Sequence, residues 1–132
     1  IYQTNDIKSR INEMIKTPNN NWSVPLQISE SDSVSNILPV ADVGAGGMLN
    51  IAWIEKGTNA DRLIFTNGWW YPGEIYTNSN ITDVSLSTNL QYFDNKVFLA
   101  IQESDNKIKF FSFIDDPGWF EVLFDTLGSL PC

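Results

Sequence analysis

Apolar and polar residues alternate along this chain in short runs, which are separated by glycine, asparagine and aspartate. The segment KIKFFSF (107–113) alternates for most of its length, as a strand with one buried face does. NIAWI (50–54) and VFLAI (97–101) are nearly continuous apolar runs, which are typical of strands covered on both faces. The runs are short and rich in β-branched and aromatic residues, so the pattern predicts an all-β protein.

The pattern repeats itself along the chain with a period of about 48 residues. Trp22, Trp70 and Trp119 open three similar segments, at spacings of 48 and 49 residues. Two further pairs of segments keep nearly the same spacing: MLNIAW (48–53) with KVFLAI (96–101), and RLIFT (62–66) with KFFSF (109–113). Three landmarks in one register indicate an internal repeat.

Each repeat is predicted to contain four strands. The predicted strands are 37–43, 48–55, 62–66 and 69–76 in the first repeat, and 82–88, 96–103, 107–113 and 119–125 in the second. Four strands in a unit of this size are typical of a β-propeller blade. A single β-sandwich and a β-trefoil-like barrel are the alternatives, but a sandwich predicts no such period. We therefore expect residues 22–132 to form one extra leading strand, in WSVPLQIS (22–29), followed by two propeller blades.

Residues 1–21 are predicted to form a short N-terminal helix and a linker. Ile7, Ile11, Met14 and Ile15 follow the spacing of one helical stripe, and Pro18 would end the helix. This helix is expected to cover an edge or the mouth of the propeller; the alternative is a helix that binds a membrane or a partner.

Two blades cannot close a ring, because propellers have about four to eight. We therefore expect a homo-oligomer whose copies close the ring together, or a piece of a longer propeller.

Charge and composition exclude several classes of function. Sixteen acidic and eight basic residues give a net charge of −8, which argues against binding to nucleic acid or an anionic membrane. The chain has no histidine, and its only cysteine is Cys132, so imidazole catalysis and Cys/His zinc sites are excluded within one chain. We expect no metal, no cofactor and no membrane insertion. Asn21 and Asn80 begin N-glycosylation sequons, which favour a secreted or extracellular protein.

Catalysis is not expected. Sialidases hold their substrate with three arginines, and this chain has only Arg10 and Arg62. Other glycosidases need paired carboxylates, and the candidates lie beside predicted hairpin turns, where acids are ordinarily solvated: Glu55, Asp61, Glu103 and Asp105.

Aromatic residues are the best candidates for a ligand site. Sugars stack their C–H faces on aromatic rings and bond their hydroxyls to polar side chains. The repeated Trp22, Trp70 and Trp119 are expected to pack between blades, whereas Trp69 has no counterpart in the repeat. The predicted ligand-binding residues are Trp69 and Tyr71 as the stacking surface, with Asn67, Glu74 and Arg62 as the polar groups.

Two segments resemble blades of the fungal and bacterial fucose-binding lectins: KVFLAIQESDNKIKFFSFIDDPGWFE (96–121) and LNIAWIEKGTNADRLIFTNGWWYPGEI (49–75). The resemblance implies a lectin with two blades per chain that closes six blades as a trimer. In that family an arginine early in the second strand and a glutamate in the third bind the sugar. Phe98 and Phe110 occupy these positions, so the resemblance implies a lectin with a different sugar site. A structural or protein-interaction propeller is the alternative function, and a glycoside-processing enzyme is the third.

Overall fold

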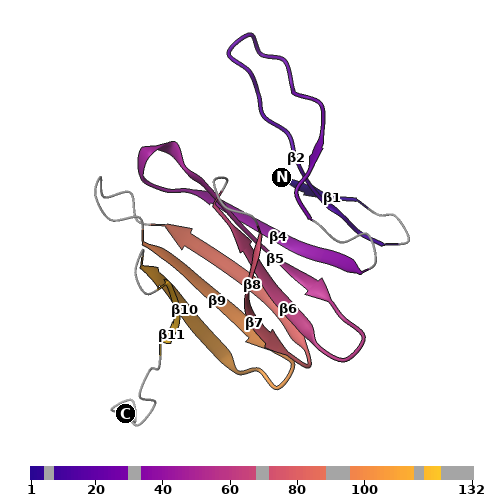
Figure 1. Cartoon of the computed structure of the whole chain (residues 1–132), viewed down its shortest axis with the longest axis vertical. Helices are drawn as coiled ribbons and strands as arrows, with labels where there is room; N and C mark the ends of the chain where they lie inside the picture. Colours follow the sequence, from indigo (N-terminus) through magenta and orange to yellow (C-terminus); the bar gives the residue numbers. More distant parts are fainter. Residues whose placement is uncertain (5–7, 30–33, 68–71, 89–95, 115–117, 123–132) are drawn as a thin grey trace, which may run out of the picture.

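The computed structural model describes residues 1–4, 8–29, 34–67, 72–88, 96–114 and 118–122 (Figure 1). These residues form three antiparallel sheets and one short 3₁₀ turn at Ala45–Gly47, and they contain no α-helix. The prediction of an all-β protein is confirmed. The described part of the chain shows neither a propeller nor a closed ring. It also contains no helix that is long and apolar enough to cross a membrane.

Each predicted repeat forms one four-stranded sheet whose strands follow one another in chain order. Sheet I consists of β4 (Ser35–Val43), β5 (Leu49–Lys56), β6 (Asp61–Thr66) and β7 (Gly73–Asn78). Sheet II consists of β8 (Ile81–Thr88), β9 (Val97–Glu103), β10 (Ile108–Ile114) and β11 (Gly118–Val122). All eight predicted strands are therefore present, with small shifts at their ends. Residues 69–71 and 123–125 of the predicted strands lie outside the described residues.

The repeat extends to an irregularity of the backbone. The pairing of β4 with β5 shifts between Ile37 and Val40, and the pairing of β8 with β9 shifts between Ile81 and Asp83. Both shifts lie in the first strand of a sheet, in the middle of β4 and at the start of β8. A bulge increases the local twist of a strand. The two sheets therefore share their strand order and a bulged first strand, with the bulges at different positions.

Sheets I and II pack face to face around the main core. Ala52, Ile54, Leu63 and Phe65 of sheet I meet a set of buried residues from sheet II: Ile81, Val84, Val97, Leu99, Ile101, Phe111 and Phe113. The opposite face of sheet I buries Ile51, Trp53 and Ile64 against Ile11. Because both faces of β5 are covered, its apolar run has almost no polar interruption.

The prediction that VFLAI is covered on both faces is wrong. Val97, Leu99 and Ile101 are at most 1% exposed, but Phe98 between them is 46% exposed. The physical reason is that sheet I covers one face of sheet II, and no described element covers the other.

The predicted N-terminal helix is also wrong for the described residues. In its place β1 (Tyr2–Gln3), β2 (Ile11–Glu13) and β3 (Leu26–Gln27) form a three-stranded sheet, which we call the N-terminal sheet. Residues four apart lie on one face of a helix, but they also lie on one face of an extended strand. Ile11 is fully buried against sheet I, and its backbone carbonyl accepts a hydrogen bond from the amide of Ile28. Tertiary packing therefore selected the strand. β3 lies within the predicted extra strand 22–29.

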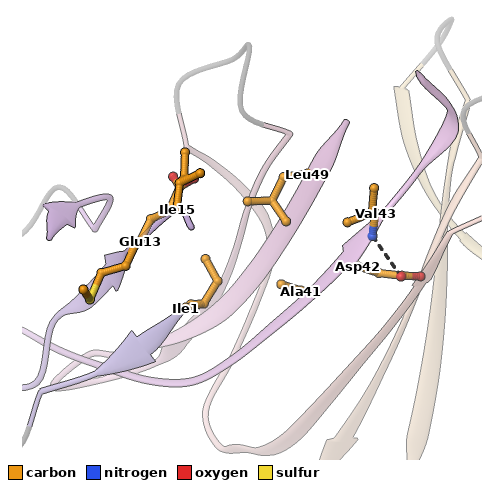
Figure 2. Close-up of a pocket in the computed structure, with 8 residues that line it drawn as sticks. Ile1, Glu13, Ile15, Ala41, Asp42, Val43 and Leu49 are labelled. Atoms are coloured by element: carbon orange, nitrogen blue, oxygen red, sulfur yellow. Dashed lines mark hydrogen bonds between the residues drawn. The ribbon is translucent and has the colours of Figure 1, made fainter. Parts of the chain in front are cut away.

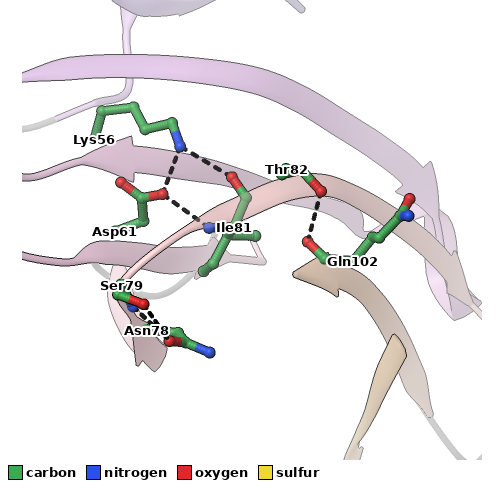
Figure 3. Close-up of polar contacts among 7 residues, drawn as sticks. All are labelled: Lys56, Asp61, Asn78, Ser79, Ile81, Thr82 and Gln102. Atoms are coloured by element: carbon green, nitrogen blue, oxygen red, sulfur yellow. Dashed lines mark hydrogen bonds and ion pairs between the residues drawn. The ribbon is translucent and has the colours of Figure 1, made fainter. Parts of the chain in front are cut away.

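Two polar contacts fasten the first strand of sheet II to sheet I. At one end, the buried Asp61 carboxylate accepts hydrogen bonds from the amide of Ile81 at 2.8 Å and from the ammonium group of Lys56 (Figure 3). Lys56 also donates to the carbonyl of Ile81 at 3.0 Å. At the other end, the Asp42 carboxylate accepts bonds from the amide and the hydroxyl of Thr88, at 2.8 and 2.9 Å.

Replacement of Asp61 is expected to loosen the contact between the two sheets. Asp61→Ala leaves a partly buried ammonium group and a buried amide without their acceptor, which should cost about 3 kcal/mol of unfolding free energy. Chemical denaturation measures this loss. Asp83→Ala, at an exposed position of β8, is the control and should change stability far less. Equal losses in the two variants would show that Asp61 does not fasten the sheets.

The contact at Asp42 is expected to depend on pH. Hydrogen bonds from the side chain and the amide of Thr88, and from the amide of Val43, lower the pKa of Asp42 below its usual value of 3.8. A carboxyl group whose pKa is lower in the folded state stabilises that state at any pH above its unfolded pKa. This stabilisation is lost as the pH falls through the folded pKa. Asp42→Ala should therefore destabilise the protein by about 1 kcal/mol at pH 7.

The loss in Asp42→Ala should shrink below pH 4, when the wild-type carboxyl takes up a proton. Thermal unfolding across this pH range measures the change. Thr88→Val removes one donor to Asp42, and its stability difference from the wild type should likewise shrink below pH 4. A difference between wild type and Asp42→Ala that is constant from pH 7 to pH 3 would contradict the assignment.

Candidate functional site

Three of the five predicted ligand-binding residues lie within the described structure. Arg62 is the second residue of β6, Asn67 directly follows β6, and Glu74 is the second residue of β7. Trp69 and Tyr71 lie outside the described residues, so the stacking surface stays a prediction. The structure brings Arg62 and Glu74 together and places Asn67 at the far end of β6.

Arg62 forms a charged cluster with two carboxylates on one face of sheet I. It pairs with Glu55 of the neighbouring strand, and its Nη1 lies 3.6 Å from Oε2 of Glu74. The side chains of Arg62 and Glu74 are 45% and 46% exposed, whereas that of Glu55 is 9% exposed. The hydroxyl of Thr77 donates a further bond to Glu74 at 2.6 Å. The cluster therefore exposes one cation, Arg62, and one carboxylate, Glu74, to solvent. The buried carboxylate of Glu55 fixes the position of Arg62.

A bulge between β6 and β7 brings Glu74 to this face. Leu63 pairs with Tyr76, but the next residue, Ile64, pairs with Glu74. In an unshifted register Glu74 would pair with Phe65, whose side chain points to the opposite face of the sheet. Bulges commonly redirect a side chain in this way. The one-residue shift thus creates the contact between Arg62 and Glu74.

Asn67 is only 6% exposed. A ligand could reach its side chain only if neighbouring groups moved aside. Its part in binding stays a prediction.

A second charged pair occupies the corresponding place in sheet II. Lys109 and Glu121 follow Arg62 and Glu74 by 47 residues each, and Nζ of Lys109 lies 3.1 Å from Oε1 of Glu121. Glu121 pairs with Phe111 across the strands, as Glu74 pairs with Ile64. This pair was not among the predicted site residues, although the repeat aligns RLIFT with KFFSF and thus Arg62 with Lys109. The same spacing applied to charged residues would have found it.

Tyr76 of sheet I lies beside the second pair. Its ring centroid is 4.9 Å from Nζ of Lys109, and its hydroxyl donates to Oε1 of Glu103 at 2.7 Å. Burial, followed by the bond to Glu103, raises the pKa of Tyr76. Hydrogen bonds with Tyr76 and then Glu121 raise the pKa of Lys109. At neutral pH the site therefore contains a protonated phenol and a fully charged ammonium group.

An aromatic cleft lies between the outer strands of the two sheets. Trp119 packs edge-on against Phe65 at a centroid distance of 4.9 Å and lies 5.3 Å from Phe113. These rings line a cavity of about 140 Å³ together with Thr66 and Ile75. This volume is below the range of about 300–1,000 Å³ that is usual for small-molecule pockets, so we interpret the cleft as packing between sheets.

Of the repeated tryptophans, Trp119 packs between the two sheets, whereas the packing of Trp22 between blades stays a prediction. Trp119 joins the core between the two sheets, but Trp22 is 61% exposed. The reason is that sheet I covers Trp119, whereas no described sheet covers the side of the N-terminal sheet that faces away from sheet I. Trp70 lies outside the described residues.

A larger cavity of about 420 Å³ separates the N-terminal sheet from sheet I (Figure 2). Its apolar walls include Ile1, Ile15, Val43 and Leu49, and its polar residues are Glu13 and Asp42. The carboxylate of Asp42 is already bonded to Thr88 and Val43. A sugar needs several polar groups that point toward it, and the polar residues along this cavity are two acids, Glu13 and the already bonded Asp42, with no cationic side chain among the described residues that line it.

Within the described residues, no group of three or more acidic, histidine or cysteine side chains could hold a metal ion. Comparison of the chain with protein families, with curated proteins and with solved structures found no match in any of the three.

Proposed function

We propose that this protein is a lectin: a non-catalytic, carbohydrate-binding protein with one sugar site on each of its two sheets. The observation that carries the proposal is the recurrence of a partly exposed cation–carboxylate pair, Arg62 with Glu74 and Lys109 with Glu121. A single exposed ion pair contributes little to stability, so folding alone does not explain a second pair at the equivalent position. Binding of the same kind of ligand to both sheets would explain it.

Such a pair is chemically suited to sugar hydroxyls. A hydroxyl group both donates and accepts hydrogen bonds. Each carboxylate accepts bonds from hydroxyl groups, while the guanidinium or ammonium group donates to their oxygens. Buried Glu55 holds the position of Arg62, and Tyr76 holds that of Lys109. A site whose donors are positioned in advance loses less entropy on binding.

Stacking completes the proposed sites. In sheet I, the proposed aromatic surface is Trp69 and Tyr71, and the polar groups are Arg62 and Glu74. Asn67 lies at the other end of β6 and is 6% exposed, so it takes part only if its neighbours move aside. At the site on sheet II, the ring of Tyr76 from sheet I lies beside Lys109. One stacked ring and a few hydrogen bonds, at about 1 kcal/mol each, give a dissociation constant between millimolar and tens of micromolar.

Useful binding strength then requires several sites on one particle. We propose that the protein is secreted and that copies of the chain assemble into a homo-oligomeric β-propeller ring. A trimer is the expected form. Such a ring raises avidity without new contacts. The stacking of two equivalent sheets supports this assembly, because a propeller repeats the same contact around an axis.

Catalysis is not part of the proposal. The four candidate carboxylates are engaged with other groups: Glu55 with Arg62, Asp61 with Lys56 and the Ile81 amide, Glu103 with Tyr76 and Asn78, and Asp105 with Lys107.

The test is glycan binding by the wild-type chain and by variants at each site. A glycan array identifies a ligand, and calorimetry then measures its affinity and stoichiometry. Glu74→Gln should weaken binding at the first site about tenfold, because it replaces a charged acceptor but leaves Arg62 paired with Glu55. Lys109→Ala should remove the second site, so the stoichiometry should fall from two sugars per chain to one.

Lys107→Ala changes an exposed cation in the β9–β10 turn and is the control. It should bind as the wild type does. Melting temperatures verify that each variant is folded. Unchanged binding by the double variant of Glu74→Gln and Lys109→Ala, or no glycan bound at all, would overturn the proposal.

A further inference from the structure

Sheet II exposes a large apolar face, which we call the outer face. Phe98, Ile108, Phe110 and Phe120 are 46%, 60%, 39% and 40% exposed. Ser112 pairs with both Phe98 and Phe120, and Phe110 and Ile108 follow at alternate positions of the same strand. The four side chains therefore lie on one side of three adjacent strands. Contiguous apolar surfaces of this kind commonly mark interfaces.

The outer face corresponds to a face that sheet I buries. The repeat relates Ala52 to Ala100 and Leu63 to Phe110. Ala52 and Leu63 belong to the core between sheets I and II. Sheet II thus presents to solvent the same face with which sheet I contacts its neighbour.

The three sheets stack in one direction, and both contacts involve the first strand of the following sheet. β1 and β2 lie against β4, the first strand of sheet I, and β4, β5 and β6 lie against β8, the first strand of sheet II (Figure 1). The amide of Asn36 bonds to the carbonyl of Ser9, just before β2. Likewise the amide of Ile81 bonds to Asp61, at the start of β6. The N-terminal sheet therefore occupies the position of a preceding repeat.

The N-terminal sheet in turn has an uncovered side with aromatic residues. Tyr2 is 38% exposed and pairs with Asn12, next to Ile11, whose side chain points to sheet I. Tyr2 consequently lies on the face away from sheet I. Trp22 is 61% exposed and is the counterpart of Trp119, which packs on Phe65 of the sheet that precedes it. Trp22 lacks such a sheet among the described residues.

From these two ends we infer that copies of this chain associate head to tail, with the N-terminal sheet of one copy, including Tyr2 and Trp22, packed on the outer face of sheet II of the next. The contact continues the stacking that already joins sheet I to sheet II. A contact between two different surfaces produces a ring where the rotation closes. The inference rests on the ring assembly of the proposed function, but it requires no sugar and is tested without one.

The first experiment measures molar mass by light scattering between 1 and 100 µM. The wild-type chain should form assemblies whose mass is a multiple of 14.9 kDa. Phe110→Lys should weaken assembly at least about 30-fold, as loss of a central interface residue does. Trp22→Lys should do the same from the other side. Thr58→Lys adds the same charge at an exposed position of the β5–β6 turn, outside both surfaces, and should assemble normally.

The second experiment mixes the two deficient variants. Phe110→Lys retains an intact N-terminal surface, and Trp22→Lys retains an intact outer face. Head-to-tail contact predicts that the equimolar mixture forms a one-to-one dimer, although each variant alone is a monomer. Ile108→Lys replaces Phe110→Lys if the latter fails to fold by circular dichroism.

Three outcomes would overturn the inference. The wild-type chain could be a monomer at 100 µM. Trp22→Lys could assemble like the wild type, which would indicate two outer faces packed against each other. The mixture could also remain monomeric. Glycan binding by monomeric Phe110→Lys would leave the lectin proposal intact in each case, so the two proposals fail separately.

Discussion

Burial of apolar side chains on both faces of a sheet is the constraint on which this structure depends. Ile51 and Trp53 point to one side of β5, while Ala52 and Ile54 point to the other, and all four are almost completely buried. A four-stranded sheet cannot cover either face by itself. Sheet I therefore needs a neighbour on each side, and the N-terminal sheet and sheet II fill these places. The polar contacts of Asp61 and Asp42 then fix the position of the second sheet.

Most strands could be predicted from the sequence, because alternation and turn residues are local signals. The repeat supported them, since two independent segments indicated the same four elements. The N-terminal helix was wrong for a physical reason: a spacing of four is compatible with helix and strand alike, and only the packing of Ile11 distinguishes them. The exposure of Phe98 was equally hidden, because a run of apolar residues does not tell which neighbours are present.

The candidate site could be predicted only in part. Arg62 and Glu74 were chosen for their chemistry and lie together, but their contact depends on a bulge between Leu63 and Ile64 that no residue type announces. The participation of Glu55 follows from cross-strand pairing with Arg62, and this pairing requires a known register. Lys109 and Glu121, in contrast, were available from the spacing alone. Long-range register, rather than local propensity, limited the prediction.

The serial order of the three sheets bears on how the molecule opens. Among the described elements, the N-terminal sheet makes its main contacts with sheet I, and its strands are two or three residues long. Structures with contacts between nearest neighbours open from their ends, and each unit has its own free energy of opening. Amide protons of β2 should therefore exchange through a local opening that leaves the core of Leu99 and Phe65 closed. The protein would then consist of a stable pair of sheets and a terminal unit whose order depends on what lies beside it.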